Sequence, residues 1–517
     1  MFDPERVIAD EARGMSISYW ASLKPDAPAV HDRFGCKSFG QINARANQIV
    51  RLLRGRGIGP GAHIAFAASN RSEVVEIFAA CLRGGYRLVP VNWHLKGDEA
   101  AYILKDCDAA AAFVEDRFTD VVEGARRTPD LLKIGVGAPI DGFLRLNEAA
   151  AALNADDIDD PTLGSTMFYT SGTTGRPKGV FRQGLNLLAA DALKKYDPDT
   201  DVQLCAGPVY HGAGLTLDTR TAMTIGVPLV YLDRWESEAA LLAIQEHGVT
   251  HGHFVPIMFQ RLLALPSAVR EAYDLSSLKH VMHGAAPCPP EVKRAMIAWW
   301  GPILHEYYAG TEGGAGFMMD SCEWLKRPGS VGRRPATIGV KILSDDGQPA
   351  PAGAPGRIYF QRPAANGFHY YKDPAKTEAS HAGDYFTLGD IGYFDEDDYL
   401  FLTGRSADCI ISGGVNIYPQ EIDDVILAHP AVEDVACVGA PNREWGEEIR
   451  AVVALRAGAQ PSPALAAEII ALVKDRLAGF KAPRAVDFVD ALPRNATGKI
   501  ERAKVREAYW HGRAVQI

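Results

Sequence analysis

Hydrophobic and polar positions alternate between helical and strand-like spacing along the first part of the chain. Ser38–Arg56 has apolar residues near helical spacing, and the glycine-rich stretch RGRGIGPGA ends this helix before the short apolar run His63–Ala67. Glu73–Arg83 predicts a second helix, and Arg87–Val91 predicts a buried strand. This strand–helix–strand order favours a parallel sheet with helices on both faces.

The middle of the chain repeats this order more clearly. The predicted strands are Val202–Val209, Thr250–Phe254, Lys279–His283 and Ile303–Tyr308, and the predicted helices are Ser237–His247, Pro256–Leu265 and Glu291–Trp300. Ligands bind beyond the carboxyl ends of the strands in open α/β sheets. Three segments lie at such ends, namely HGAG (His211–Gly214), GAAP (Gly284–Pro287) and YYAGTEGG (Tyr307–Gly314).

From about Arg333 the pattern changes to short strands separated by Gly, Pro and Asp turns, which indicates an antiparallel region. After Gly404–Arg405 both types of element occur together. We expect a glycine turn at Gly413–Gly414, helices at Pro419–Ala428 and Ala464–Leu477, and strands at Val432–Val438 and Glu448–Leu455. The predicted division is an N-terminal domain at 1–406 and a small C-terminal domain at 407–517.

Composition narrows the class of protein. The chain has 517 residues, of which 47% are hydrophobic and 23% charged, as in soluble proteins with several cores. The net charge of -10 argues against a nucleic-acid binder, because neutralising phosphates requires clustered Lys and Arg. No run approaches the ~20 apolar residues of a membrane span. The N-terminus lacks the apolar region of a secretory signal, and the eight cysteines show neither CxxC nor zinc-ligand spacing. We therefore expect a cytoplasmic protein with free thiols.

The segment Tyr169–Gly179 (YTSGTTGRPKG) concentrates Ser, Thr and Gly around one lysine. Glycines let backbone N–H groups turn inward to form an anion-binding concavity, hydroxyl groups add donors, and Lys178 adds a mobile positive charge. The spacing of a Walker A loop is absent, and an ordinary surface loop is the alternative. The candidate phosphate-binding residues are Thr170, Ser171, Gly172, Thr173, Thr174, Gly175 and Lys178.

The string YTSGTTGRPKGV resembles the phosphate loop of the adenylate-forming superfamily, which contains acyl- and aryl-CoA synthetases, peptide-synthetase adenylation domains and beetle luciferases. Further motifs follow in the family's order, so the resemblance covers nearly the whole chain. It implies an α/β fold with a large N-terminal domain of doubly wound sheets, a small distorted antiparallel barrel, and a small mobile α+β C-terminal domain.

Two of the strand-end segments take specific roles from this resemblance. YYAGTEGG matches the family's Y-G-x-T-E segment, although Ala309 replaces the usual glycine. The match implies that Tyr308 stacks on adenine, Thr311 contacts the α-phosphate and Glu312 holds Mg²⁺. GAAP matches a loop that lines the adenine and acyl pockets, which gives the candidates Gly284, Ala285 and Ala286.

Three later segments complete the implied site. TLGDIGYF and GRSADCIISGGVNIYPQEID imply that Asp390 and Arg405 bind the ribose, and LPRNATGKIER implies that Lys499 is the catalytic lysine. A cation there stabilises charge that builds on the phosphate oxygens during attack. The resemblance also implies a rotation of the C-terminal domain that removes Lys499 and presents Gly413–Gly414 to a pantetheine tunnel. Ala407 stands where the family's hinge usually has Asp or Lys.

The sequence specifies the carboxylic acid substrate and the acyl acceptor less closely than the nucleotide site. His211 matches a position beside the acyl carboxylate, and the absence of a nearby aspartate argues against amino acids as substrates. Trp445 lies in NREWGE, which with FKAPR (Phe480–Arg484) resembles segments near the CoA site. Small residues around His211 leave room for a long or bulky acid. Candidate residues of the acyl pocket wall are His251, His253, Met258, Met282, Met318 and Met319.

The resulting prediction is an ATP-dependent carboxylic acid–CoA ligase that uses ATP, Mg²⁺ and CoA. The expected acid is medium- to long-chain or bulky, of an alicyclic or steroid-side-chain type. A stand-alone acyl-AMP ligase that loads a carrier protein is the alternative, and a luciferase-like oxygenase remains open. A binding protein without activity would be expected to lose Lys499, Glu312 or the phosphate loop, and the sequence retains all three. The expected partners are small molecules, and a homodimer is an open possibility.

Overall fold

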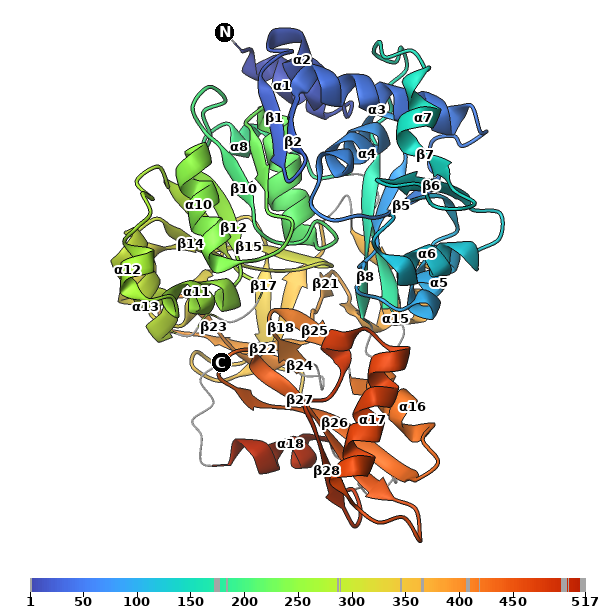
Figure 1. Ribbon diagram of the computed structural model, residues 1–517. Coiled ribbons are helices and arrows are strands. Elements are labelled where there is room, and N and C mark those ends of the chain that lie inside the picture. The colour runs from blue at the N-terminus through green and yellow to red at the C-terminus, as the bar shows by residue number, and fades with distance from the viewer. Residues whose placement is uncertain are drawn as a thin grey trace.

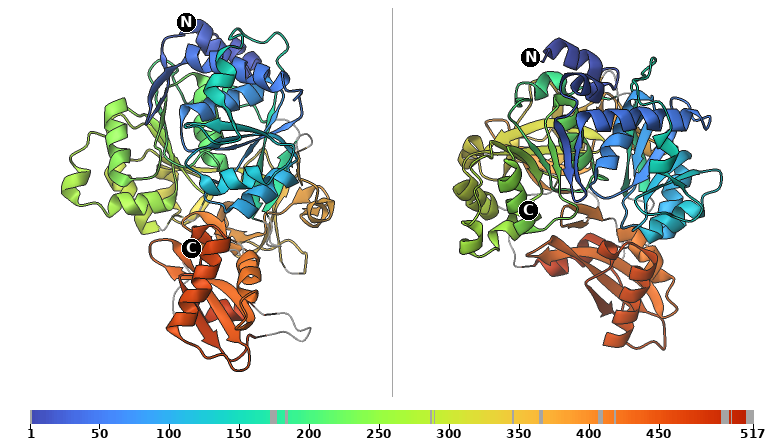
Figure 2. Two further views of the ribbon diagram at one scale, coloured as in Figure 1. Left: turned by 45° about the vertical axis from the view of Figure 1, so that its right-hand side comes forward. Right: turned by 45° about the horizontal axis from the view of Figure 1, so that its top comes forward.

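The computed structural model describes residues 2–171, 177–182, 185–285, 288, 290–344, 346–363, 367–405, 410–417, 419–493, 500 and 502–511. Over these residues the chain forms a large N-terminal domain with three sheets and a small C-terminal domain with a fourth. Figure 1 shows the C-terminal domain, in orange and red, packed against the end of the large domain that lies opposite the N-terminus. The two further views in Figure 2 show the same arrangement.

The first large sheet is parallel at its centre and antiparallel at both edges. In spatial order its strands are β15 (Gly313–Asp320), β14 (Leu304–Gly310), β13 (His280–His283), β12 (His251–Phe254), β10 (Gln203–Cys205), β11 (Leu229–Tyr231), β1 (Pro28–Asp32) and β2 (Gly35–Ser38). One face carries an apolar core shared with α10 (Ser237–His247), α11 (Pro256–Leu263) and α13 (Pro290–Trp300). The carboxyl ends of β13 and β14 lead directly into the GAAP and TEGG segments predicted to bind nucleotide.

The second large sheet has the same design. Its strands are β19 (Phe368–Tyr370), β9 (Pro177–Arg182), β8 (Ser165–Ser171), β4 (Arg87–Pro90), β3 (His63–Ala67), β5 (Ala109–Glu115), β6 (Leu132–Val136) and β7 (Leu144–Arg145). Pairing is parallel from β8 to β7 and antiparallel where β9 and β19 extend the sheet. Helices α5 (Gly97–Asp106), α6 (Thr119–Arg126) and α7 (Leu146–Ala151) belong to this half. The predicted parallel sheets with helices are therefore confirmed.

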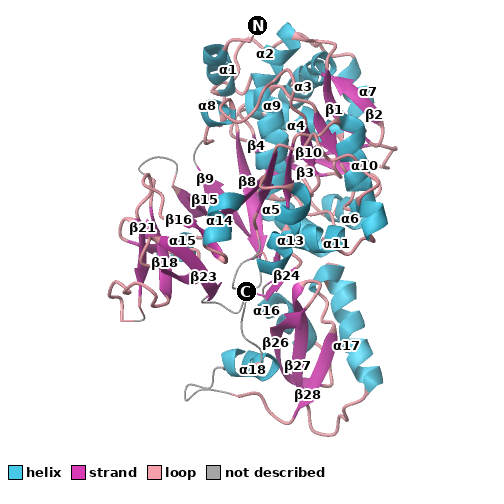
Figure 3. Cartoon of the chain, turned by 90° about the vertical axis from the view of Figure 1, so that its left-hand side faces the viewer, coloured by secondary structure: helices cyan, strands magenta, loops and turns pink. Residues whose placement is uncertain are grey.

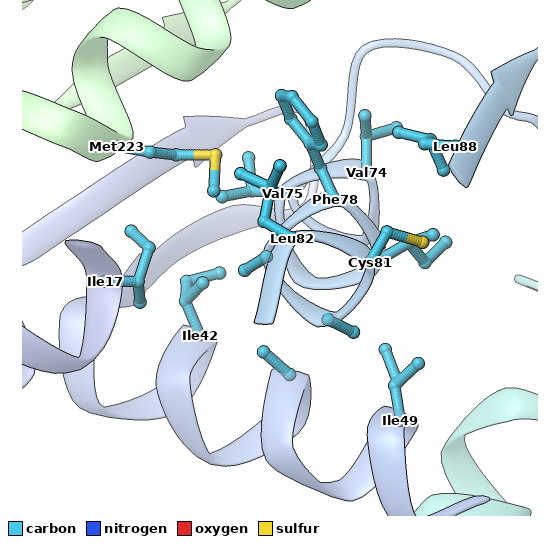
Figure 4. Close-up of a cluster of buried hydrophobic side chains, with 14 of the residues drawn as sticks. Ile17, Ile42, Ile49, Val74, Val75, Phe78, Cys81, Leu82, Leu88 and Met223 are labelled. Carbon is cyan, nitrogen blue, oxygen red and sulfur yellow. The ribbon is translucent and has the colours of Figure 1, made fainter. Parts of the chain in front are cut away.

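Helix α4 (Ser72–Arg83) belongs to the core that joins these two halves, and all its residues are buried. Figure 4 shows Phe78 and Val75 of α4 facing Met223 of α9 (Thr221–Ile225), with Ile42 of α3 (Phe39–Arg54) below. Burying each such side chain contributes about 1.5–3 kcal/mol. At the charged end of the helix, Arg83 Nη1 donates to Asn43 Oδ1 at 2.7 Å, while Nε and Nη2 are buried without a hydrogen-bond partner among the described residues. Burial lowers the pKa of Arg83 to about 10.

The third sheet is the predicted antiparallel region. It runs in the order β16 (Ser330–Arg333), β23 (Tyr399–Arg405), β22 (Asp390–Phe394), β18 (Gly356–Gln361), β21 (Tyr385–Phe386) and β20 (His381–Ala382), and β17 (Val340–Leu343) pairs with β18. Phe317 of β15 belongs to the same apolar core as Phe360 and Phe394 of this sheet, which fixes it beside the first large sheet.

The C-terminal domain is a small α+β unit, seen at the bottom of Figure 3. Its sheet contains β25 (Val415–Ile417), β24 (Ile410–Ser412), β27 (Gly446–Leu455), β26 (Val432–Asn442) and β28 (Ala485–Val489), and its helices are α16 (Pro419–Leu427), α17 (Pro463–Arg476) and α18 (Arg502–Trp510). A separate apolar core joins α16 and α17 to the sheet. The last strand of the large domain ends at Arg405 and the first of this domain begins at Ile410.

One predicted strand is wrong in extent. Val202–Val209 was expected to be a single strand, but β10 covers only Gln203–Cys205, because Gly207 and Pro208 follow and the chain turns away. It then forms a π-helix, η1 (Ala213–Arg220), that the pattern does not predict. π-Helices are rare and often mark functional sites. No described helix is long and apolar enough to cross a membrane.

The remaining helices are short. They are α1 (Pro4–Glu11), α2 (Ser16–Leu23), α8 (Ala189–Ala192), α12 (Ser267–Arg270), α14 (Ser321–Lys326), α15 (Pro374–Ala379) and the 3-10 turn η2 (Gly479–Lys481).

Candidate active site

The predicted phosphate loop connects two antiparallel strands at the edge of the second large sheet. Thr170 on β8 pairs with Lys178 on β9, so strand pairing holds the two ends of the loop side by side. Gly172, Thr173, Thr174 and Gly175 lie outside the described residues, as does the side chain of Ser171. Lys178 Nζ lies 2.9 Å from Asp373 Oδ2, and this hydrogen bond raises the pKa of the lysine. Lys178 is therefore held as a cation beside the loop.

The adenine and ribose candidates meet on neighbouring strands. Tyr308, near the end of β14, donates a 2.5 Å hydrogen bond to Asp390 Oδ2 at the start of β22. Asp390 also stands directly opposite Arg405 in the antiparallel pair of β22 and β23. Asp390 is 5% exposed, so its carboxylate is positioned by the protein before any ligand binds. Tyr308 and Asp390 are thus in direct contact, and the backbone of Arg405 lies opposite Asp390.

Thr311 and Glu312 occupy the tight turn between β14 and β15. Glu312 Oε1 accepts a hydrogen bond from Tyr370 Oη at 2.9 Å, and the Thr311 carbonyl accepts one from Arg182 at 3.2 Å. Burial lowers the pKa of Lys376, while the nearby charge of Glu312 opposes that shift. The turn therefore presents one carboxylate among several cationic and hydroxyl groups.

The residues around Glu312 suit a single Mg²⁺ held mainly by phosphates. Among the described residues, no group of three or more His, Cys, Asp or Glu is arranged to hold a metal ion. Mg²⁺ keeps most of its waters and is commonly bound by one or two carboxylates together with substrate phosphates. One carboxylate beside a phosphate loop fits that pattern.

Close backbone contact shapes the GAAP loop after β13. A Cβ atom on Gly284 would lie 2.7 Å from both the ring and the carbonyl oxygen of Tyr307, so a side chain is excluded at this position. Ala285 follows with a φ of 66°, which is costly for a residue with a side chain. Strain of this kind clusters at ligand sites. Ala286 lies outside the described residues.

His211 lies in the loop between β10 and η1, close to the phosphate hairpin. A Cβ atom on the adjacent Gly212 would be 4.0 Å from the ring of Phe168 on β8. The His211 side chain is exposed to solvent, yet protein atoms surround it and this desolvation lowers its pKa to about 4. The imidazole is therefore neutral near pH 7. It can hydrogen-bond to a carboxylate without titrating near neutral pH.

The predicted acyl-pocket residues do not all lie on the same face of the sheet. His253 and Met282 are partners in the pairing of β12 and β13 and therefore share one face of the sheet. His253 Nε2 lies 3.0 Å from the hydroxyl of Tyr307. Met258 and Met319 instead pack in the core beneath α10, α11 and α13. The prediction that these two methionines line the same wall as His253 is therefore wrong, because both side chains pack in the core between the sheet and its helices.

On the C-terminal domain, Gly413 and Gly414 form the turn between β24 and β25, with φ values of 58° and 80°. The Gly413 N–H donates to the Trp445 carbonyl at 2.8 Å, and a Cβ on Gly413 would lie 2.6 Å from the Trp445 ring. The Trp445 ring centroid is 5.0 Å from the guanidinium of Arg261, which belongs to the large domain. A Cβ on Gly414 would be 3.9 Å from Val255 of the large domain. This turn therefore faces the large domain beside the end of β12.

Several residues around the site escaped the sequence analysis. Arg182, Tyr370 and Asp373 each contact a predicted site residue, but Tyr370 is 58 positions from Glu312. Tyr370 lies beside Glu312 only because β19 pairs with β9, and no local sequence motif predicts that pairing. Lys499 and the hinge residue Ala407 lie outside the described residues, and of Arg405 only the backbone is described.

Comparison with known families accounts for both domains. The AMP-binding enzyme family matches residues 17–371, and the AMP-binding enzyme C-terminal domain matches residues 421–499. A fatty acid–[acyl-carrier-protein] ligase, ScoC of Streptomyces coeruleorubidus, is 30% identical over 97% of this chain and 97% of its own.

Solved structures agree over the full length. The amide bond synthetase McbA of Marinactinospora thermotolerans superposes with a TM-score of 0.85 at 26% identity, covering 96% of this chain and 99% of that one. Two complexes of the o-succinylbenzoate CoA synthetase MenE of Bacillus subtilis are also similar. A double mutant with the product analogue OSB-NCoA gives a TM-score of 0.81, covering 95% of this chain and 98% of that one, at 26% identity. The complex with the acyl-adenylate OSB-AMP gives 0.65 at 26% identity, covering 95% and 97%.

Proposed function

The chain belongs to the AMP-binding enzyme family and is an adenylate-forming acid–thiol ligase, and on that premise we propose that it joins a carboxylic acid to CoA in two steps. In the first step a carboxylate oxygen attacks the α-phosphorus of ATP, and the bond to pyrophosphate breaks. In the second step the thiolate of CoA attacks the acyl carbon of the adenylate, and AMP leaves.

One observation carries the first step. The phosphate hairpin, the Thr311–Glu312 turn and the Tyr308–Asp390 pair converge through direct contacts from β9, β14, β19 and β22. In this proposal Tyr308 supports adenine, Asp390 and Arg405 hold the ribose, and Thr311 donates to the α-phosphate. Glu312 would hold Mg²⁺, which screens the phosphate charge when bound. Lys178 then follows the leaving pyrophosphate.

His211 and Lys499 complete the first step on the acyl side. The neutral His211 imidazole orients the acid by hydrogen bonding, and Lys499 stabilises the charge that develops at the α-phosphate during attack. Gly284, Ala285 and the other residues of the GAAP loop line the adenine and acyl pockets. Surrounding protein excludes water from the mixed anhydride.

The proposal of CoA as acceptor is supported by the orientation of the C-terminal domain. Gly413 and Gly414 face the large domain beside Val255, and Trp445 stands between the guanidinium groups of Arg261 and Arg484, at 5.0 and 5.5 Å. Cations around a partly buried aromatic ring suit the phosphates and adenine of CoA. The higher TM-score with MenE bound to a CoA product analogue than with its acyl-adenylate also favours an arrangement for the second step.

The acid itself is proposed from the space around His211. Gly212, Ala213 and Gly214 are small, as is Gly252 in the middle of β12, so we propose a medium- to long-chain or bulky alicyclic or steroid-side-chain acid. We further propose that the enzyme acts in the cytoplasm, since each of the seven described cysteines is a free thiol.

A second candidate function rests on a specific relative. ScoC is described as a ligase that loads an acyl-carrier protein, so a carrier-bound thiol is the competing acceptor. Both acceptors present a pantetheine thiol, and both would use the same first step.

The deciding experiment measures acid-dependent AMP release with and without CoA across short, long, aromatic and steroidal carboxylates. CoA-dependent AMP release together with acyl-CoA formation supports the ligase proposal. Acyl transfer to a carrier protein, with no acyl-CoA formed, would replace it with the second candidate. Absence of acid-dependent pyrophosphate release for every acid would contradict the proposed substrate classes.

A further inference from the structure

A buried ion cluster joins the two domains at the base of the large domain. Lys481 Nζ, in η2 of the C-terminal domain, lies 2.8 Å from Glu99 Oε1 of the large domain and 2.8 Å from Glu421 Oε2 of α16. The side chains of Lys481, Glu99 and Glu421 are only 5%, 13% and 7% exposed. We refer to these three residues as the interdomain cluster.

Backbone contacts anchor the same junction. Glu99 is in the first turn of α5, where its Oε2 accepts the N–H of Lys96 at 2.9 Å and the N–H of Ala478 at 3.1 Å. Ala478 is fully buried among apolar residues of the second large sheet. One carboxylate therefore caps a helix of the large domain and binds two groups of the C-terminal domain.

Among the described residues, a second charged contact between the domains is more exposed to solvent than the interdomain cluster. Arg261 and Glu444 lie 3.4 Å apart, but their side chains are 36% and 58% exposed. Exposed pairs contribute little to stability, whereas breaking a buried pair leaves an uncompensated charge and costs several times more. The interdomain cluster is therefore the electrostatic contact on which the domain arrangement depends.

We propose that the interdomain cluster is the latch that holds the C-terminal domain in the orientation for thioester formation, with Glu99 and Lys481 as positioning residues for the second step. This inference rests on the proposed two-step function. Lys481 and Glu421 belong to the same domain and stay together when that domain rotates. Glu99 pairs with Lys481 only in the orientation seen here.

Glu99 and Glu421 therefore have opposite effects on the equilibrium between the docked and undocked orientations of the C-terminal domain. Glu99 favours the docked orientation because its attraction to Lys481 exists only there. Glu421 neutralises Lys481 in both orientations and repels Glu99 when the domains dock, so it reduces the preference for docking. Among the described residues, Glu421 Oε1 is buried without a hydrogen-bond partner, which adds to the cost of holding this carboxylate in the junction.

The test compares Glu99→Gln with Asp98→Asn. Asp98 is in the same turn of α5 but is 89% exposed and pairs with Arg127 of its own domain. The two half-reactions are measured separately, as acid-dependent pyrophosphate release and as thioester formation from supplied acyl-adenylate. Docking is measured without turnover, by the rate at which an amine-reactive reagent labels Lys481.

Glu99→Gln is expected to slow thioester formation about 10-fold, within the range of typical coupling between sites, and to speed Lys481 labelling by a similar factor. Pyrophosphate release should not fall, and Asp98→Asn should change neither quantity. Lys481→Met should reproduce the half-reaction pattern without disturbing the cap of α5, which covers the case in which Glu99→Gln folds poorly. Glu421→Gln should leave Lys481 at least as protected and should not slow thioester formation.

Equal loss of both half-reactions in Glu99→Gln and Lys481→Met would overturn the latch, as would unchanged Lys481 labelling in Glu99→Gln. The same would follow if Glu421→Gln behaved like Glu99→Gln. These outcomes differ from failure of the proposed function, in which the unaltered enzyme itself forms no adenylate or transfers no acyl group to CoA. Lys481 labelling still reports the domain contact in that case.

Discussion

The nucleotide side and the CoA side of the candidate site are built in different ways. On the nucleotide side, Tyr308, Asp390 and Glu312 are held by strands of one domain, and their contacts run between neighbouring sheets. On the CoA side, Gly414 and Trp445 reach the large domain across a domain boundary, next to exposed residues and one buried ion cluster.

This difference indicates what each side is for. A site whose groups are fixed by strand pairing is preorganised, so its hydrogen bonds cost little reorganisation when charge develops. A site completed by a few contacts between domains can be assembled and taken apart at small free-energy cost, as gating requires. Substitutions on the nucleotide side should therefore affect adenylation, and those on the CoA side should affect only the second step.

The largest expected effect is that of Lys499→Ala, which tests whether one domain serves both steps with different residues. We expect adenylation to fall by about 10²- to 10³-fold, because a positioned cation no longer stabilises the charge on the phosphate oxygens. Thioester formation from supplied acyl-adenylate should be largely spared. The measurement is the single-turnover rate of each half-reaction, and equal loss of both would contradict the role assigned to Lys499.

The next effect is that of Asp390→Asn on the nucleotide side. Hydrogen bonds to a charged group contribute about 1.5–3 kcal/mol, so kcat/KM for ATP should fall by roughly 10- to 100-fold. The amide can still accept from Tyr308, so the fold should be retained. ATP-dependent pyrophosphate release checks this, with Asp397→Asn in the exposed turn after β22 as the control. A matching loss in the control would show that the effect is not specific to ribose.

A smaller effect is expected for Trp445→Ala on the CoA side. Removing the ring between Arg261 and Arg484 should raise KM for CoA about 10-fold, since a large aromatic side chain at an interface commonly contributes more than 1 kcal/mol. Adenylation measured without CoA on the same preparation should stay unchanged. If adenylation falls as well, the Trp445 ring also supports the large domain. Substitution on the CoA side would then affect both steps, contrary to the distinction drawn between the nucleotide side and the CoA side.

The sequence predicts the nucleotide side better than the CoA side for a physical reason. Strands such as His63–Ala67 and helices such as Ser237–His247 follow from local periodicity, and the structure has both with these bounds. Tyr308 and Glu312 stand in a recognisable motif at the carboxyl end of β14, where open α/β sheets bind ligands, and Asp390 stands in a second motif at the start of β22.

Features that depend on long-range packing cannot be predicted from local sequence patterns. Glu99 and Lys481 are 382 positions apart and belong to no shared motif, and nothing local distinguishes them from solvated charges. The π-helix at Ala213–Arg220 and the early end of β10 likewise depend on how the chain packs between two sheets. Tertiary context overrides local preference at such places.

The last expected effect concerns the stability of the large domain and not its activity. Burial lowers the pKa of His253, which is 3% exposed, to about 4, whereas the ordinary histidine value is about 6.5. As pH falls from 7 through 6.5 toward 4, the unfolded chain takes up a proton that folded His253 excludes, so the stability of the folded state falls. At pH 5 this amounts to about 2 kcal/mol for one such group. Thermal unfolding midpoints should therefore drop less between pH 7 and pH 5 in His253→Gln than in the unaltered chain. Equal drops would mean that His253 binds its proton equally well in the folded and unfolded states, contrary to its burial in the folded chain.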